Sequence, residues 1–206
     1  MKKELMLSAL VALVVLPSAA FADDFKADPF QFGLGALATW ARDAGEPDQR
    51  GDHKQFGLYI QKHTVTANFA AAGVRNMLKK PMSAAELTTL SFDISGHSSE
   101  AGTFTPGDPR HGYCGAGAPR FNVDSGGGTC FLGCTHGIKT QDPATGWWEI
   151  KFTPPFTAFP GCEGGVSGDV TSIIIVFDEG NDVGPGNVVI DNIGINDKVI
   201  GKPTGD

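Results

Sequence analysis

Runs of alternating apolar and polar residues predict a chain built mainly of short β-strands. In residues 90–95, the side chains of Leu90, Phe92 and Ile94 fall on one face and polar side chains on the other. This pattern is typical of a strand with one buried face. Similar runs are separated by segments rich in Gly and Pro. The other predicted strands of this kind are residues 56–62, 64–71, 121–124, 129–132 and 147–153.

Two local motifs refine this pattern. Residues 125–128, Ser-Gly-Gly-Gly, lie between two predicted strands and indicate a hairpin with a four-residue loop. Ser83 and Glu86 have the spacing of a capping box, which predicts one helical turn.

Two apolar runs near the C-terminus predict central strands. Residues 172–177 are apolar and largely β-branched, which favours a strand buried on both faces, and residues 188–195 form the second strand. The loop that joins them is acidic and contains Asp178, Glu179 and Asp182 among Gly and Pro residues.

Asp191 lies inside the last of these strands. Strict alternation puts its carboxylate on the same side as Val189 and Ile193, among apolar neighbours. Burial of an unpaired carboxylate costs several kcal/mol or more. We therefore expect Asp191 to meet a cation, a group of backbone N–H donors or a bound metal ion.

These patterns predict an all-β protein, a two-sheet antiparallel β-sandwich (jelly roll) with long disulfide-stapled loops. The length of 206 residues suits one domain. We expect a signal peptide at 1–22, an irregular N-terminal segment at 23–55, the β-sandwich domain at 56–197 and a polar tail at 198–206.

The first residues have the pattern of a secretory signal peptide. Lys2 and Lys3 precede an apolar run at 5–16, and an A-x-A site ends at Ala22. We expect a mature chain that starts at Asp23 and is secreted or periplasmic. Membrane insertion is not expected, because no later run approaches the ~18 apolar residues of a membrane span.

The charge of the chain bears on its partners. The formal net charge is −7 at pH 7, and no cluster of Lys and Arg is present. These features argue against nucleic acid as a partner and against adhesion to anionic membranes.

Four cysteines in an exported chain predict two disulfides. We favour Cys114–Cys134 with Cys130–Cys162, although the spacing alone does not decide among the three possible pairings.

The alternative interpretation is that the cysteines and histidines bind a metal ion. His111-x-x-Cys114 and Cys134-x-His136 have ligand-like spacing, but they depart from the CxxC pairs of structural zinc sites. A copper or zinc site made by the fold from His97, His111 and His136 also stays open.

Calcium is the metal ion that best suits the acidic residues, because it takes about six to eight oxygen ligands from carboxylates and carbonyls. The acidic loop does not match an EF-hand. We expect a structural Ca²⁺ held by Asp191, Asp93 or the loop residues Asp178 and Asp182. The alternative is a solvated acidic loop, with Asp191 hydrogen-bonded to the backbone.

Trp147 is the strongest candidate for contact with a ligand. Alternation directs it away from the side of Trp148, and an exposed indole stacks on the C–H face of a sugar ring. The alternative is that the N-terminal segment or a second buried face covers it. Arg110 and Tyr113, in the long loop at 96–117, are further candidate ligand-binding residues.

The sequence VVIDNIGIN, preceded by SIIIVFDEG, resembles the C-terminal strands of galactose-binding-like jelly-roll domains of exported bacterial proteins. This superfamily includes many carbohydrate-binding modules. The resemblance implies that Asp191 helps to hold a structural calcium and that Phe92 and Asp93 match the F-D of an early strand.

We therefore expect an exported, non-catalytic binding module for carbohydrate or a glycan surface. One alternative is a structural or surface-associated protein without a sugar site. The other is a glycan-active hydrolase, which requires two carboxylates, such as those of Glu149 and Glu163, to meet in a cleft.

Overall fold

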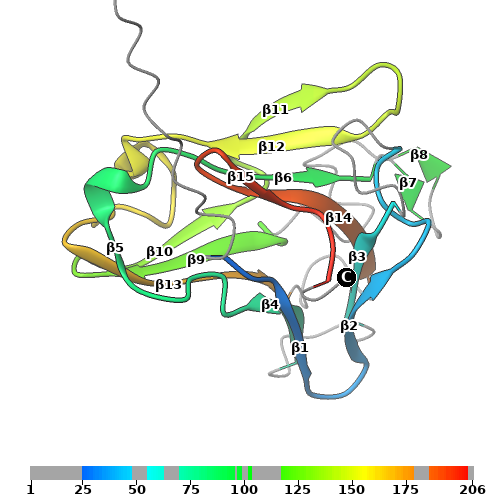
Figure 1. Ribbon diagram of the computed structural model, residues 1–206, viewed down its shortest axis with the longest axis horizontal. Helices are drawn as coiled ribbons and strands as arrows, with labels where there is room; N and C mark the ends of the chain where they lie inside the picture. The colour runs from blue at the N-terminus through cyan, green and yellow to red at the C-terminus, as the bar shows by residue number, and fades with distance from the viewer. Residues whose placement is uncertain are drawn as a thin grey trace, which may run out of the picture.

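The fold is a sandwich of two antiparallel β-sheets, shown in Figure 1. The predicted fold class, a two-sheet antiparallel sandwich of the jelly-roll type, is confirmed. The computed structural model describes residues 25–47, 55–62, 70–95, 97–98, 102–103, 117–178 and 186–203. Within this part of the chain, no helix is long and apolar enough to cross a membrane.

The larger sheet has the strand order β11-β12-β6-β14-β3-β2, with β15 paired to β14. Its strands are β2 (Ala36–Ala41), β3 (Gly57–Lys62), β6 (Leu90–Ile94), β11 (Ile138–Gln141), β12 (Trp148–Phe152), β14 (Gly186–Ile195) and β15 (Lys198–Ile200).

The smaller sheet has the order β1-β4-β13-β9-β10, with β5 paired to β13. Its strands are β1 (Asp28–Phe32), β4 (Ala71–Arg75), β5 (Met82–Ser83), β9 (Arg120–Ser125), β10 (Gly128–Gly133) and β13 (Asp169–Phe177). A separate pair is formed by β7 (His97–Ser98) and β8 (Gly102–Thr103), and two 3₁₀ turns are η1 (Ala84–Glu86) and η3 (Phe156–Ala158).

The hydrophobic core lies between the two sheets. Phe92 and Phe152 of the larger sheet meet Phe121 of the smaller sheet, with ring centroids 5.5 Å and 6.1 Å from that of Phe121. All three side chains are fully buried, so each contributes about 1.5–3 kcal/mol of hydrophobic stabilisation.

The strands with strong alternation lie where the sequence predicts them. β3, β6 and β12 agree with the predicted runs to within one residue at each end, and the two C-terminal runs become β13 and β14, each in the middle of its own sheet. The predicted hairpin is β9–β10, with a tighter turn in which Ser125 pairs with Gly128. The predicted capping box of Ser83 and Glu86 is confirmed at η1. The predicted strand at 64–71 lies mostly outside the described residues.

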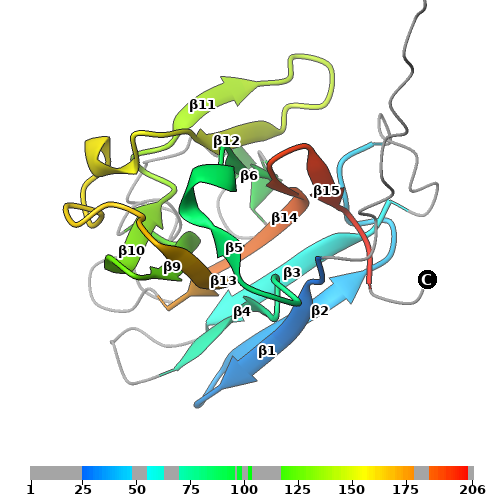
Figure 2. The ribbon, with the colours of Figure 1, turned by 60° about the vertical axis from the view of Figure 1, so that its left-hand side comes forward.

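Two expected segment boundaries are wrong. Residues 23–55 were expected to be irregular, yet they contain β1 and β2, which lie side by side in Figure 2 and belong to different sheets. In β2 the inward positions Ala36 and Ala38 are small, so the apolar alternation is weak in the sequence. The expected polar tail at 198–206 likewise begins with β15, because it folds back on β14 through a short turn.

A β-bulge in β14 places Asp191 and Ile193 on opposite faces of the sheet. The register with β6 shifts between Asp191 and Gly194, and Asn192 has a left-handed φ of +46°. The extra residue puts Ile190 and Ile193 on the core side together. Asp191 therefore lies on the outer face of the sheet, and its expected position beside Ile193 is wrong.

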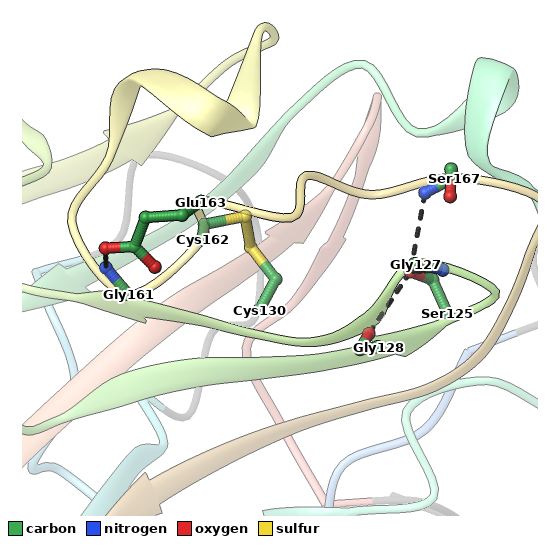
Figure 3. The surroundings of a disulfide bond; sticks show 8 residues. All are labelled: Ser125, Gly127, Gly128, Cys130, Gly161, Cys162, Glu163 and Ser167. Atoms are coloured by element: carbon green, nitrogen blue, oxygen red, sulfur yellow. Dashed lines mark hydrogen bonds between the residues drawn. A yellow bond between two sulfur atoms is a disulfide. The ribbon is translucent and has the colours of Figure 1, made fainter.

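One disulfide fastens the long connection before β13 to the edge of the smaller sheet (Figure 3). Cys130 on β10 is bonded to Cys162, as expected. Beside it, the Phe131 amide donates to the Gly161 carbonyl at 2.8 Å. Cys134 is also in a disulfide, which excludes its thiolate as a metal ligand. Its expected partner Cys114 lies outside the described residues.

Candidate functional site

A row of polar side chains crosses the outer face of the larger sheet. Asp191 on β14 is opposite Asp93 on β6, Asp93 is opposite Glu149 on β12, and Glu149 is opposite Thr140 on β11. Residues directly opposite each other in antiparallel strands project from the same face. Phe92, the neighbour of Asp93, points into the core, so this row faces away from it.

Asp191 is buried although it lies on the outer face. Residues 42–47, which we call the strap, cover it: the Glu46 amide donates to Asp191 Oδ2 at 2.9 Å. The Asn192 amide donates to Oδ1 at 2.7 Å. Only 4% of Asp191 is exposed, which confirms the expectation of a buried carboxylate with backbone N–H partners. A Cβ at Gly45 would lie 2.6 Å from Asp191 Oδ2, so the strap needs glycine there.

Asn192 links the strap to the acidic row. Its side-chain amide donates to Asp93 Oδ2 at 2.7 Å and to Glu46 Oε2 at 3.0 Å. The Thr145 hydroxyl donates to Glu46 Oε1 at 2.8 Å. These neutral donors hold the carboxylates of Asp93 and Glu46 in fixed positions.

A cavity of about 190 Å³ opens between the acidic row, the strap and the β11–β12 turn. We call it the outer-face cavity. Its described lining residues are Glu46, Asp93, Thr140, Gln141, Asp142, Trp147 and Glu149.

Trp147 belongs to this cavity and is not an open platform. As expected, it does not join the core cluster against which Trp148 packs. The expectation of an exposed indole is wrong, since only 6% of Trp147 is exposed. Trp147 lies at the base of the β11–β12 turn, where the Asp142 amide donates a hydrogen bond to the Trp147 carbonyl at 2.9 Å. Trp147 thus lies in the wall of a cavity, and its contact with a ligand stays a prediction.

The four expected calcium ligands do not meet. Asp93 and Asp191 are neighbours, but Asp178 follows β13 in the other sheet, and both its carboxylate oxygens accept from Arg120 at 2.6 Å. Asp182 lies outside the described residues. In the part of the chain that the structure describes, no group of three or more His, Cys, Asp or Glu side chains is arranged to hold a metal ion. The arrangement seen for these residues therefore does not fit calcium, which stays a prediction.

A second cavity, of about 340 Å³, lies on the other sheet beside the disulfide shown in Figure 3. Its described lining residues are Gly117, Arg120, Phe131, Gly133, His136, Pro160 and Gly161. Phe131 is 42% exposed, and the Arg120 guanidinium lies 5.6 Å from its ring centroid. The candidate residues Arg110, Tyr113 and His111, and the side chain of His97, lie outside the described part.

Sequence reasoning missed Glu46, Asn192 and Thr140. Glu46 lies in a polar run that has the composition of a loop, and its role follows from a hydrogen bond across 145 positions to Asp191. For Asn192 the sequence contains one indication of the bulge, because Asn is among the few residues that readily adopt a left-handed φ. Thr140 belongs to β11, whose exposed edge has no strong alternation.

Comparison with known proteins assigns no family. No protein-family model matches this chain, and no curated protein matches its sequence. One similar solved structure is that of CBM27-1 from Caldicellulosiruptor saccharolyticus in complex with mannohexaose, with 14% identity over 84% of this chain and 86% of that chain and a TM-score of 0.39. A TM-score this low leaves the function to be inferred from the residues of this chain.

Proposed function

We propose that this protein is an exported, non-catalytic module that binds carbohydrate in the outer-face cavity. The observation that carries the proposal is the lining of that cavity, to which Trp147 contributes together with residues that have hydroxyl, amide and carboxylate groups. Binding sites typically combine an apolar or aromatic wall with a few positioned polar groups.

The chemistry of the lining suits a sugar. Carboxylates accept hydrogen bonds from sugar hydroxyls, and Thr140 and Gln141 both donate and accept. The Trp147 ring supplies an apolar surface for the C–H face of the sugar. Because Asn192 and the strap already hold the carboxylates in place, little conformational freedom is lost when the ligand binds.

The size of the cavity limits the ligand. Its volume of about 190 Å³ is below the roughly 300–1,000 Å³ of pockets that enclose drug-sized molecules. Trp147 is almost fully buried and cannot support a long chain lying flat. We infer that the cavity takes one sugar unit or the end of a glycan chain.

Calorimetric titration with a panel of oligosaccharides tests the proposal. Thr140→Ala should weaken binding about threefold to tenfold, because one neutral hydrogen bond is worth about 0.5–1.5 kcal/mol. Thr129→Ala is the matched control, since Thr129 is also exposed on an edge strand but belongs to the other sheet. Equal affinities for the two variants, or no binding of any sugar, would contradict the proposal.

One observation favours a second candidate function, glycoside hydrolysis. Asp93 and Glu149 are directly opposite each other and line the same cavity, and retaining glycosidases use two carboxyl groups about 5–5.5 Å apart. The pair named from the sequence, Glu149 and Glu163, is not formed, because Glu163 lies beside Gly161 in the connection that the disulfide fastens to the smaller sheet. If the wild type releases reducing ends from a glycan and Glu149→Gln does not, the protein is a glycoside hydrolase and not a non-catalytic binding module.

A further inference from the structure

We propose that Thr145 is a positioning residue of the outer-face cavity, and that its hydroxyl group joins the β11–β12 turn to the strap. This inference rests on the proposed function, because it names the residue that sets the walls of the same site before the ligand arrives. Thr145 is not among the described residues that line the cavity. It acts through Glu46 and Trp147, which do line it.

Hydrogen bonds within the β11–β12 turn fix its shape around Thr145. The Asp142 amide donates to the Trp147 carbonyl at 2.9 Å, and the Gly146 amide donates to the Asp142 carbonyl at 2.8 Å. The Ala144 amide donates to Asp142 Oδ1 at 2.7 Å. These three bonds do not involve the Thr145 side chain. We therefore expect the turn to keep its shape when the Thr145 hydroxyl is removed.

The Thr145 hydroxyl contacts two residues that line the cavity. Its oxygen accepts from the Trp147 amide at 3.3 Å, and the hydroxyl donates to Glu46 Oε1 at 2.8 Å. A hydroxyl can donate one hydrogen bond and accept others at the same time. The bond to Glu46 is the stronger of the two, because its acceptor is a carboxylate. One side chain thus fixes Trp147 relative to Glu46, which is 99 positions away from Thr145 in the sequence.

The connection continues from Glu46 to the central strands of the larger sheet. Glu46 Oε2 accepts from Asn192 Nδ2 at 3.0 Å, and the same nitrogen donates to Asp93 Oδ2 at 2.7 Å. A carboxylate accepts on both oxygens, so Glu46 receives one donor from the turn and another from β14. A continuous chain of hydrogen bonds therefore runs from Trp147 through Thr145, Glu46 and Asn192 to Asp93. Bonds in such a chain polarise and strengthen one another.

This chain positions three lining residues that come from three different elements. Trp147 belongs to the β11–β12 turn, Glu46 to the strap and Asp93 to β6. A cavity whose walls are already in place binds its ligand more tightly than one that must first be ordered. Without the Thr145 hydroxyl, the arrangement that binds the ligand is populated less, and the apparent affinity falls in proportion.

NMR spectra of the protein without sugar test the chain itself. The probe is the side-chain amide of Asn192, which lies two hydrogen bonds from Thr145. Thr145→Val keeps the shape of the side chain and removes the hydroxyl, so the Asn192 signals should move. Thr145→Ser keeps the hydroxyl and should restore them. Thr129→Val is the matched control, because the Thr129 hydroxyl also donates to a carboxylate, Asp124 Oδ1 at 2.7 Å, but on the smaller sheet. It should leave the Asn192 signals unchanged.

Calorimetric titration with the oligosaccharide that binds best to the wild type measures the consequence for binding. Thr145→Val should bind this sugar about threefold to tenfold more weakly, because fewer molecules have the walls in place. Thr145→Ser and Thr129→Val should bind it like the wild type. All titrations are run below the melting temperature of every variant, so that the comparison is between folded proteins.

Three outcomes overturn the inference. The first is that the Asn192 signals do not move in Thr145→Val. The second is that Thr145→Ser behaves like Thr145→Val in both measurements. The third is wild-type affinity in Thr145→Val although the Asn192 signals move, which leaves the proposed function intact. If the wild type binds no sugar, the proposed function itself is wrong, and the Asn192 signals still decide whether the Thr145 hydroxyl connects the turn to β14.

Discussion

At the scale of single residues, Asp191 and Asn192 show how one irregular position organises the site. The bulge follows Asp191 and returns Ile193 to the core side, so the Asp191 carboxylate is outward, where two backbone amides bind it. The same bulge directs the Asn192 side chain at Asp93 and Glu46. The sequence predicted the burial of Asp191 and its need for a partner, because a carboxylate inside an apolar strand requires one. It did not predict the face, since alternation assumes a regular strand.

Asp191→Ala should lower the free energy of unfolding by about 2–4 kcal/mol, because the amides of Glu46 and Asn192 would lose their buried acceptor. Urea denaturation of the purified protein measures this change. Asp169→Ala, an exposed residue of β13, should stay within about 0.5 kcal/mol of the wild type. If Asp191→Ala unfolds at the same urea concentration as the wild type, the hydrogen bonds between the strap and this carboxylate do not stabilise the fold.

Glu163 gives a pH-dependent prediction. The Gly161 amide donates to its carboxylate at 3.0 Å and lowers its pKa below the ordinary value of 4.5. A lowered carboxyl pKa stabilises the fold above the unfolded-state pKa, and this contribution is lost as the pH falls through the folded-state pKa. The wild type should therefore melt slightly above Glu163→Gln at neutral pH, and the two melting temperatures should converge once the pH falls below the lowered folded-state pKa. A difference in melting temperature that increases at acidic pH would contradict an origin in the lowered pKa of Glu163.

At the scale of elements, the strap is the segment that turns a flat sheet face into a cavity. Its residues 42–47 cross the outer face between β2 and β3, and the Ala44 and Gly45 amides both donate to the Gln55 carbonyl. No periodic pattern marks such a segment, because its contacts are made by backbone groups and by residues distant in the sequence. This is the physical reason why the composition of residues 42–47 indicated only a loop.

Gly45→Ala should displace the strap. The added Cβ would meet the Phe56 carbonyl oxygen at 2.4 Å and Asp191 Oδ2 at 2.6 Å, and overpacking of this kind costs typically about 1–3 kcal/mol. We expect a lower melting temperature and weaker glycan binding together. If Gly45→Ala is less stable but binds glycan with the affinity of the wild type, the strap does not contribute to the binding site.

The disulfide between β10 and its facing loop makes a separate prediction. Replacing both Cys130 and Cys162 by Ala should lower the free energy of unfolding by about 2–5 kcal/mol, because the unfolded chain is no longer constrained. Glycan binding at the outer-face cavity, on the other sheet, should persist at a temperature where this variant is folded. Loss of sugar binding in the folded variant would place the ligand near the second cavity instead.

At the scale of the whole molecule, the sequence predicted the architecture better than the site. Strands such as β6 and β14 could be predicted from the sequence because their alternation of apolar and polar residues reflects burial on one face. β1 and β2 were not predicted, because β1 is largely exposed and two inward positions of β2 are filled by the small side chains of Ala36 and Ala38. The cavity depends on residues from the strap, β6, β11 and β12, whose meeting is a consequence of strand order and register.

Calcium is tested at this scale, because a structural ion would stabilise the whole fold. If Asp93 and Asp191 hold Ca²⁺, adding EDTA should lower the melting temperature, and excess Ca²⁺ should restore it. Asp182→Asn changes only the acidic loop. If this variant still loses stability in EDTA, the Ca²⁺ is held at the outer face and not by the loop. An unchanged melting curve in EDTA would show that no structural Ca²⁺ stabilises the fold.

The most direct test of carbohydrate binding at the outer-face cavity is an NMR titration with the sugar that binds most tightly. We expect the largest shift changes on the Trp147 indole N–H and on the amides of Thr140, Gln141 and Glu149, at one end of the larger sheet. Largest changes at Phe131 and His136 on the other sheet, or none in the presence of saturating sugar, would contradict binding at this cavity.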